Sequence, residues 1–476
     1  MDSPNNQNQQ LHVFFMPFIA PGHIIPMIDL AKLFASRGVK SSIITTAAYT
    51  DKVYQSIQKS ASESPIQVLA MTTAAGTITW EQASEEAKVD LFFNSASTFA
   101  EPLKELLEQH RPDCLVADTF FTWTTELAAS LRVPKVVFGG KCFFSLCAEQ
   151  SLVEHYPHNT VSSDDDAFVI PNLPGDGIEF TRGQISEAWK SESVFTHFFK
   201  KCLDSERDSY GVLVNSFYEL EPLYADHYRS AVAKRAWHVG PVSLFAGGAE
   251  EKESRGMVTV TEAAAVDRHE CLKWLDSKKP NSVIYLCFGS DAEFTAAQNS
   301  ELAAGLEGSG QGFVWVVKRR EDLPDGFEER VEGQGLVIEG WAPQLLILGH
   351  AAVGGFVTHC GWNSVVEAIA AGVPMVTWPL AAEQFFNEKL VSKVLRVGVE
   401  VGARRWVRLV GDFVRKEAVE KAVREVMVGE RAEEMRSMTR KLGGMARSAL
   451  EEGGSSLGDL SCFIEEFTLV RRRLNP

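Results

Sequence analysis

Apolar and polar residues alternate along the chain in blocks that predict strands and helices in turn. Near the N-terminus, the apolar run at 13–18 is typical of a buried strand, and a loop follows it. Residues 26–37 then repeat apolar side chains at helical spacing, Gly38 ends that helix, and 39–46 reads as a second strand. A strand, loop, helix and strand in this order form the unit from which parallel sheets are built.

The same pattern restarts in the second half of the chain, which predicts two domains. The further strands that the pattern predicts lie at 114–118, 135–140, 211–215, 283–289, 313–318, 336–341, 354–360 and 374–378. A Gly- and charge-rich stretch without clear periodicity, 246–266, is expected to link the halves. We therefore expect an α/β protein with parallel-sheet domains at 1–245 and 267–455, since one domain usually takes about 100–200 residues.

Composition narrows the classes of partner. A net charge of −16 argues against nucleic acid and anionic membrane surfaces, although one local site can still bind a nucleotide. The eight cysteines are scattered without zinc spacing, which favours reduced thiols in the core and predicts no metal site. The polar N-terminus is no signal peptide, and no apolar run approaches the roughly 20 residues of a membrane span. We expect a cytoplasmic protein with no integral membrane span.

The segment 341–384 holds residue types that suit a nucleotide sugar. Trp341 follows a strand, where an indole can stack on a base, although a lone Trp is more often a core residue. A Gly-rich strand-to-helix turn comes next, and free N–H groups at a helix start favour phosphate. A simple helix cap by Asn363 or Ser364 is the alternative. Glu367 shares a helix face with Asn363, and its carboxylate could accept from ribose hydroxyls.

Two residues of the first half suit proton transfer. His23 lies on the loop after the first strand, and an imidazole with an ordinary pKa near 6.5 suits a general base at neutral pH. Asp118 ends a strand of the same domain, so its carboxylate is expected at the same sheet edge, where it could orient the ring. Taken alone, such a His is more often next to a helix cap, and such an Asp is usually a cap. His12 is expected at the surface.

The segment 341–384 resembles, position for position, the donor-binding signature of plant family 1 UDP-glycosyltransferases, and the likeness extends over the chain after residue 11. The resemblance implies the GT-B fold, in which two Rossmann-like parallel-sheet domains face each other across a cleft. A C-terminal helix at 456–476 would return to the N-terminal domain. The resemblance also implies a UDP-dependent glycosyltransferase (EC 2.4.1.-) that inverts the anomeric configuration, with His23 as the base and Asp118 as its partner.

The resemblance assigns the donor to the second domain. The donor-binding residues that it implies are Ser290, Trp341, Ala342, Gln344, His359, Gly361, Trp362, Asn363, Ser364, Glu367, Glu383 and Gln384. Trp362 stands where some users of UDP-glucuronate carry Arg, so it fits a neutral hexose. Together with Glu383 and Gln384 it favours UDP-glucose as co-substrate, although xylose and rhamnose donors stay open. No cofactor or metal is required in such an enzyme.

The acceptor is expected in the first domain, as a small apolar molecule of the flavonoid, triterpenoid, steroid or other specialised-metabolite type. Residues that could line its pocket, or equally belong to the core, are Phe18, Ile19, Phe120, Phe121 and Phe143. Lys141 departs from the subgroup that contains flavonoid, triterpenoid and abscisate glucosyltransferases, and we expect it to point to solvent. We expect a monomer. Another UDP-sugar donor, C-glycosylation, and a non-catalytic nucleotide-sugar-binding protein are the alternatives.

Overall fold

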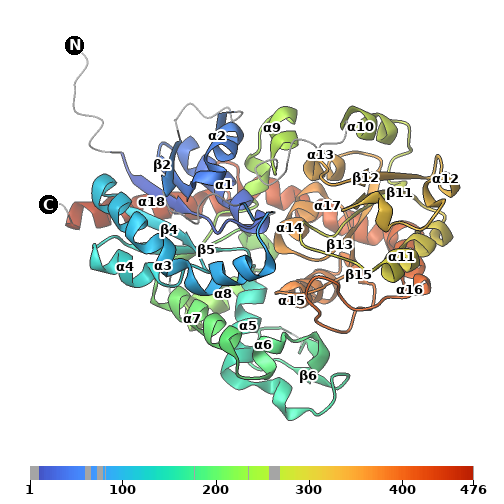
Figure 1. Cartoon of the computed structure of the whole chain (residues 1–476), viewed down its shortest axis with the longest axis horizontal. Helices are drawn as coiled ribbons and strands as arrows, with labels where there is room; N and C mark the ends of the chain where they lie inside the picture. The colour runs from blue at the N-terminus through green and yellow to red at the C-terminus, as the bar shows by residue number, and fades with distance from the viewer. Residues whose placement is uncertain are drawn as a thin grey trace. The chain divides into compact units, whose positions relative to one another are not determined.

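The computed structural model describes residues 10–58, 66–71, 79–80, 82–175, 177–233, 235–256 and 268–474. They form two compact units, each organised around a parallel sheet, which confirms the predicted α/β class. Unit 1 consists of Met1–Gly140, Ser193–Thr259 and Ser448–Pro476, and unit 2 consists of Lys141–Glu192 and Val260–Arg447. Figure 1 traces the chain through both units by residue number.

Unit 1 contains a seven-stranded sheet in the order β3-β2-β1-β4-β5-β8-β9, and every neighbouring pair is parallel. The strands are β1 (His12–Met16), β2 (Lys40–Thr46), β3 (Gln67–Met71), β4 (Cys114–Asp118), β5 (Lys135–Gly139), β8 (Gly211–Val214) and β9 (Ala236–His238). Central strands such as β1 and β4 are buried along their whole length. Helices cover both faces of such a sheet, which explains why the strands read as continuous apolar runs.

The helices of unit 1 come from three separate parts of the chain. They are α1 (Pro21–Ser36), α2 (Thr50–Gln58), α3 (Glu85–His110), α4 (Thr124–Ser130), α7 (Val194–Asp208), α8 (Pro222–Ala231), α9 (Ala249–Ser254) and α18 (Ser455–Leu474). The C-terminal helix α18, red in Figure 1, packs against β9, where the rings of Phe463 and Trp237 lie 5.1 Å apart. Arg229 of α8 also pairs with Asp459 of α18 at 2.8 Å.

Unit 2 contains a six-stranded parallel sheet in the order β12-β11-β10-β13-β14-β15 and a small antiparallel pair, β6 and β7. The strands are β6 (Ala167–Val169), β7 (Glu179–Thr181), β10 (Val283–Cys287), β11 (Gly312–Val317), β12 (Gly335–Glu339), β13 (Val353–Thr358), β14 (Met375–Thr377) and β15 (Gly398–Glu400). Its helices are α5 (Phe143–His155), α6 (Glu187–Lys190), α10 (Arg268–Asp276), α11 (Ala296–Ser309), α12 (Phe327–Arg330), α13 (Gln344–Leu348), α14 (Trp362–Ala371), α15 (Gln384–Lys389), α16 (Lys416–Val428) and α17 (Ala432–Ala449).

The grouping of residues 141–192 departs from the contiguous boundary expected at 245. This stretch belongs to unit 2, because Ser145 of α5 donates to the Asn387 side chain at 2.7 Å and the Trp406 amide donates to the Gly183 carbonyl at 2.8 Å. Periodicity predicts that a segment is a helix but not which sheet it packs against. The sequence pattern therefore could not predict that residues 141–192 belong to unit 2.

Two expectations for the N-terminal region are wrong. His12 is 7% exposed rather than at the surface, because it opens β1 and its ring contacts Phe14 and bonds to Ser42 at 2.9 Å. Burial lowers the pKa of His12 to about 4. Helix α1 begins at Pro21 rather than at 26, so His23 lies in its first turn and not on a loop. Proline at the first helical position is favoured because its missing N–H would have no partner there.

The structure also describes part of the expected linker and the surroundings of the cysteines. Residues 246–256 of the linker contain α9, in which the Glu251 carboxylate pairs with the buried Lys32 at 2.8 Å, and residues 257–266 lie outside the described part. All eight cysteines are free thiols, and six of them are buried. Within the described ranges, no helix has the length and apolar composition that a membrane span needs. Among the same residues, no three His, Cys, Asp or Glu side chains gather as metal ligands would.

Candidate active site

His23 and Asp118 meet at the carboxyl edge of the unit 1 sheet. Asp118 is the last residue of β4, and His23 lies in the first turn of α1, which follows the neighbouring strand β1. The Nδ1 atom of His23 lies 2.7 Å from Oδ2 of Asp118. The other carboxylate oxygen accepts from the Phe120 amide at 3.0 Å, so the loop after β4 fixes the carboxylate. The Asp118 side chain is 2% exposed and that of His23 21%, which leaves the imidazole accessible on one side.

Aromatic rings surround this pair. The ring of Phe120 lies 4.9 Å from the imidazole of His23, and the ring of Phe18 lies 5.7 Å from it. Phe120 also contacts Phe92 of α3 at 5.0 Å and Phe198 of α7 at 6.0 Å. The surroundings of His23 are therefore apolar and lined by aromatic rings, which suits the binding of an aromatic molecule.

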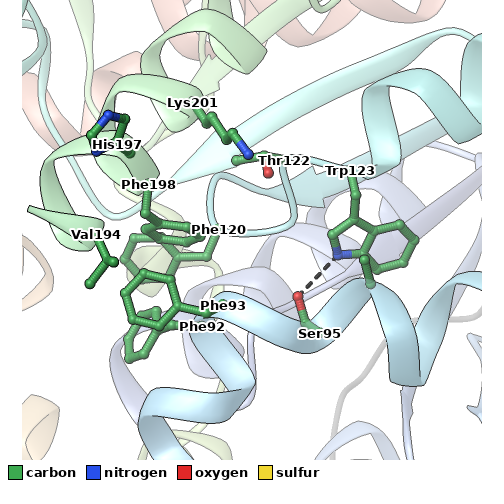
Figure 2. Close-up of a pocket in the computed structure, with 11 residues that line it drawn as sticks. Phe92, Phe93, Ser95, Phe120, Thr122, Trp123, Val194, His197, Phe198 and Lys201 are labelled. Atoms are coloured by element: carbon green, nitrogen blue, oxygen red, sulfur yellow. Dashed lines mark hydrogen bonds between the residues drawn. The ribbon is translucent and has the colours of Figure 1, made fainter.

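A pocket of about 300 Å³ lies between α3, α7 and the loop after β4, and Phe120 is part of its wall. Figure 2 shows the rings of Phe92, Phe93, Phe120 and Phe198 gathered on one side of it. The other lining residues are Ser95, Ala96, Thr122, Trp123, Val194, His197 and Lys201. The Trp123 indole donates to the buried Ser95 hydroxyl at 3.0 Å, so these two polar groups satisfy each other. Lys201 is exposed, and it is the cationic residue of the lining.

Of the five residues expected to contact the acceptor, Phe120 is the one that lines this pocket. Phe18, Phe121 and Phe143 are at most 2% exposed and lie in the cores, and Phe143 begins α5 in unit 2. Ile19 is half-buried against the unit 1 core. The expectation that Lys141 points to solvent is wrong, because its ammonium pairs with Glu149 of α5. The pocket residues that the sequence analysis missed carry a signal in the sequence, because Phe92, Phe93 and Phe198 lie on two helices that are rich in phenylalanine.

In unit 2, the turn from β13 to α14 builds a second site. Cys360 has a left-handed backbone with φ 65°, and Gly361 follows as the N-cap of α14 without any side-chain cap. A Cβ at position 361 would lie 2.5 Å from Nε2 of His359, and a Cβ at Gly289 would lie 2.9 Å from the same ring. The glycines therefore let the loop after β10, which carries Ser290, close on the imidazole. We call residues 359–364 the donor turn.

The donor turn presents hydrogen-bond donors without a formal positive charge. Burial lowers the pKa of His359 to about 4, so the imidazole is neutral at physiological pH. Among the described residues, its Nδ1 has no hydrogen-bond partner although the atom is buried. The first turn of α14 has no side-chain cap, so its N–H groups and the positive end of the helix dipole can meet an anion.

Gln344 and Glu367 form one polar cluster with Ser364, the last residue of the donor turn. The Gln344 amide donates to the Glu367 carboxylate at 2.7 Å and to the Ser364 hydroxyl at 3.3 Å. Gln344 begins α13, immediately after the half-buried Trp341 and the buried Ala342 and Pro343. The carboxylate is 3% exposed. The structure thus joins an amide, a hydroxyl and a carboxylate in one cluster, next in sequence to the indole of Trp341.

The end of the segment forms the start of α15. The side-chain oxygen of Gln384 accepts hydrogen bonds from the backbone amides of Leu380 at 2.8 Å and Ala381 at 2.9 Å. Its side-chain NH₂ group is therefore the part that could donate to a ligand. Glu383 is half-buried and accepts from Asn387 at 3.2 Å. Trp362 is 2% exposed, which makes its indole largely part of the unit 2 core. Asn387 lies three residues beyond the segment, and nothing in the sequence pattern singled it out.

Comparison with known proteins shows the family of the chain. A family model described as UDP-glucoronosyl and UDP-glucosyl transferase matches residues 257–437. The chain is 50% identical to UDP-glycosyltransferase 73B3 of Arabidopsis thaliana, over 98% of this chain and 99% of the relative. It is 48% identical to UDP-glucose flavonoid 3-O-glucosyltransferase 7 of Fragaria ananassa, over 96% of each chain.

A solved structure shows the same fold over nearly the whole length. The Glycyrrhiza uralensis enzyme UGT73P12, crystallised with glycyrrhetinic acid 3-O-monoglucuronide, superposes with a TM-score of 0.90 at 37% identity. The match covers 98% of this chain and 97% of that one. The fold is therefore GT-B, as the segment 341–384 implied. The chain belongs to plant family 1 of the UDP-glycosyltransferases, and it is an enzyme that transfers a sugar from a UDP-sugar to a small acceptor.

Proposed function

We propose that this enzyme transfers glucose from UDP-glucose to a hydroxyl group of a flat aromatic acceptor, with inversion at the anomeric carbon. The observation that carries the proposal is the 2.7 Å contact between Nδ1 of His23 and Oδ2 of Asp118 at the edge of the unit 1 sheet. With Nδ1 held by a carboxylate, the ring keeps its hydrogen on that nitrogen and accepts a proton at Nε2.

The reaction needs one proton transfer and one displacement. Nε2 of His23 removes the proton from the acceptor hydroxyl, and Asp118 stabilises the imidazolium that results. The acceptor oxygen forms a bond to the anomeric carbon as the bond from that carbon to the UDP oxygen breaks. The α-linked donor therefore gives a β-linked product, and UDP leaves with both electrons of the broken bond.

Departure of UDP places negative charge on the diphosphate, which the donor turn would stabilise. The start of α14 is uncapped, and the neutral His359 has a buried ring nitrogen without a partner in the described part of the chain. Ser290 lies on the loop whose Gly289 packs against the His359 ring. In this proposal, N–H and O–H donors take the role that a metal ion has in other transferases.

The donor preference rests on Trp362 and the pair Glu383 and Gln384. A carboxylate and an amide at the start of α15 can bond to sugar hydroxyls, while the buried Trp362 leaves no cation there for a uronic acid. The Fragaria ananassa relative is named for UDP-glucose, which supports the same donor. We propose that Trp341, Ala342, Gln344 and Glu367 hold uridine, with the Glu367 carboxylate on the ribose.

The acceptor class follows from the pocket beside Phe120. Its volume of about 300 Å³ is at the lower end of the roughly 300–1,000 Å³ that ligand pockets span. Rings of Phe92, Phe93, Phe120 and Phe198 form its walls, so a planar phenol fits better than a bulky polycyclic triterpenoid. The name of the flavonoid 3-O-glucosyltransferase from Fragaria ananassa agrees with this preference.

The test pairs a set of acceptors with three donors. Flavonols, coumarins and a pentacyclic triterpenoid alcohol are incubated with UDP-glucose, UDP-galactose or UDP-xylose, using wild type and His23→Ala. We expect β-O-glucosides of the planar phenols, and little product from the variant. Wild-type turnover by His23→Ala would refute the base, and faster use of another donor would refute the glucose preference. Acid-stable products would indicate C-glycosylation, and donor binding without any product would indicate a non-catalytic binding protein.

A further inference from the structure

Asn387 connects the two ends of the donor site through a single buried side chain. We propose that Asn387 is a positioning residue that holds the donor turn and the sugar-binding carboxylate of Glu383 in a fixed relation. The inference rests on the proposed donor site. It adds a residue outside the segment 341–384 whose task is to couple recognition of the diphosphate to recognition of the sugar.

The contacts of Asn387 reach both recognition elements. Its side-chain nitrogen donates to the carbonyl oxygen of Cys360 at 2.8 Å and to Oε1 of Glu383 at 3.2 Å. Cys360 belongs to the donor turn, and Glu383 is the N-cap residue of α15, on which Asn387 itself lies. One amide therefore joins the turn that faces the diphosphate to the carboxylate that faces the sugar.

The side-chain oxygen of Asn387 is also held by hydrogen bonds. The side-chain oxygen of Asn387 accepts from the Ser145 hydroxyl at 2.7 Å, and the Cys142 thiol lies 3.7 Å away. Asn387, Ser145, Cys142 and Cys360 are all 0% exposed. In a dry site each of these hydrogen bonds is hard to replace, because no water can take over a lost partner.

Only an amide of this length matches the set of partners. Both N–H bonds and the oxygen of Asn387 are used, whereas aspartate has no hydrogen to donate and would add a charge beside Glu383. Leucine has a similar volume but makes none of these bonds.

The donor turn needs such an anchor because its backbone is strained. Cys360 has φ 65°, in the left-handed region that side chains other than glycine seldom adopt. Its amide bonds to the Thr358 hydroxyl at 3.2 Å, and its carbonyl bonds to Asn387 at 2.8 Å. These two bonds set the peptide that leads into Gly361 and hence the direction of the first N–H groups of α14.

The experiment compares Asn387→Asp with Glu388→Gln in the full-length enzyme. Glu388 is the next residue of α15, is 1% exposed and bonds to Thr377 rather than to the donor turn, so it controls for disturbing this helix. The measurements are the dissociation constant of UDP by calorimetry, KM and kcat for UDP-glucose, and the midpoint of thermal unfolding. Glu383→Ala is included as a variant of the sugar contact alone.

We expect Asn387→Asp to weaken the binding of UDP by about 5- to 30-fold, because the variant loses both hydrogen bonds that the amide nitrogen donates and gains an uncompensated charge. KM for UDP-glucose should rise by at least as much, while kcat changes less. Glu388→Gln should leave both constants within about twofold at pH 7. Glu383→Ala should affect UDP-glucose but not UDP, and an unchanged KM in that variant would refute the proposed sugar contact, not the anchor of the turn.

Ser145→Ala keeps the inference testable if Asn387→Asp does not fold. It removes only the hydroxyl that anchors the amide oxygen, so both the UDP and UDP-glucose constants should rise together by about two- to fivefold. Unchanged constants in Ser145→Ala, or a loss of stability in Asn387→Asp with normal binding, would overturn the proposal. An effect of Asn387→Asp on UDP-glucose without any effect on UDP would also overturn it, because the side chain would then support Glu383 alone.

Discussion

The two units present their chemistry in opposite ways. Most of the residues proposed for the donor lie in the 44-residue stretch 341–384 of unit 2, around the start of α14 and α15. In unit 1 the proposed base, its proposed partner and the pocket wall come instead from α1, β4, α3 and α7, far apart in the chain. A nucleotide shared by many enzymes can be held by one local pattern, whereas an acceptor specific to each enzyme is set by scattered residues.

The polar groups of the two sites also differ. In unit 1 the buried Asp118 carboxylate pairs with a partly accessible imidazole, which can take and keep a proton. In unit 2 burial lowers the pKa of His359 to about 4, so that imidazole stays neutral and only forms hydrogen bonds. In the proposed mechanism the same residue type serves proton transfer in one unit and anion recognition in the other, and variants of each should separate rate from binding.

The largest effect is expected from His23→Ala. Loss of the base should lower kcat by about 10²–10⁴-fold, because general-base catalysis contributes that much, while the UDP dissociation constant stays unchanged. Asp118→Asn keeps the shape of the carboxylate but not its charge, and its kcat should fall by at least about tenfold. Steady-state kinetics and calorimetry with UDP check both variants. A large loss of UDP affinity in either one would contradict the division between the units.

Gly361→Ala should weaken the binding of UDP, which the variants of His23 and Asp118 should leave unchanged. The added Cβ would lie 2.5 Å from Nε2 of His359 and must displace the ring or the turn. We expect the UDP dissociation constant and KM for UDP-glucose to rise by about 10- to 100-fold, from roughly 1–3 kcal/mol of strain. Gly458→Ala is the matched control, since a Cβ there meets nothing within 4 Å. Equal binding by the two variants would show that the turn tolerates a wider backbone geometry.

Sequence patterns predicted the central strands of both sheets but not all edge strands. β4 begins and ends as expected at 114 and 118, because a fully buried strand is a continuous apolar run. β9 and β15 contain only three residues each, too few for a periodic signal. Helix α1 was expected five residues too late, because Gly22 interrupts its apolar pattern although Pro21 favours a helix start.

In the candidate site, the residues that could be predicted are those whose position follows from a strand end or a sequence motif. The contact between His23 and Asp118 was expected from strand ends that meet at one sheet edge, and the structure shows it at 2.7 Å. Phe198 and Lys201 were not expected in the pocket, because only the packing of α7 beside α3 brings them to Phe120. Asn387 is a polar residue on a short helix, and its importance depends on partners distant in sequence.

A smaller, acceptor-specific effect is expected from Phe198→Ala. Phe198 is 8% exposed and forms part of the pocket wall, so its removal should raise KM for a planar phenol by about 5- to 20-fold. KM for UDP-glucose should stay the same. Phe195→Ala is the control, because Phe195 lies on the same helix, is 37% exposed and is not part of the lining. If both variants lose acceptor affinity equally, the pocket between α3 and α7 is not the acceptor site.

The smallest effect on activity, with a clear effect on stability, is expected from Glu388→Gln. Burial, together with the nearby Glu400 carboxylate, raises the pKa of Glu388 from 4.5 to about 8. The folded enzyme therefore holds a proton here that the unfolded chain has already lost above pH 4.5. The stabilising contribution is complete below pH 4.5 and is lost as the pH rises through 8.

The glutamine variant cannot ionise, so its free energy of unfolding should exceed that of wild type increasingly from pH 5 to pH 8.5, by on the order of 1–3 kcal/mol at the upper end. Unit 1 offers the reverse case, because burial lowers the pKa of Lys135 from 10.5 to about 8. Its cost to stability is therefore constant below pH 8 and is relieved only as the pH rises above that value. Denaturant unfolding at several pH values in the lower window therefore isolates Glu388. Parallel curves for wild type and Glu388→Gln would mean that Glu388 is already ionised at neutral pH and is compensated by Lys389, which also lies on α15.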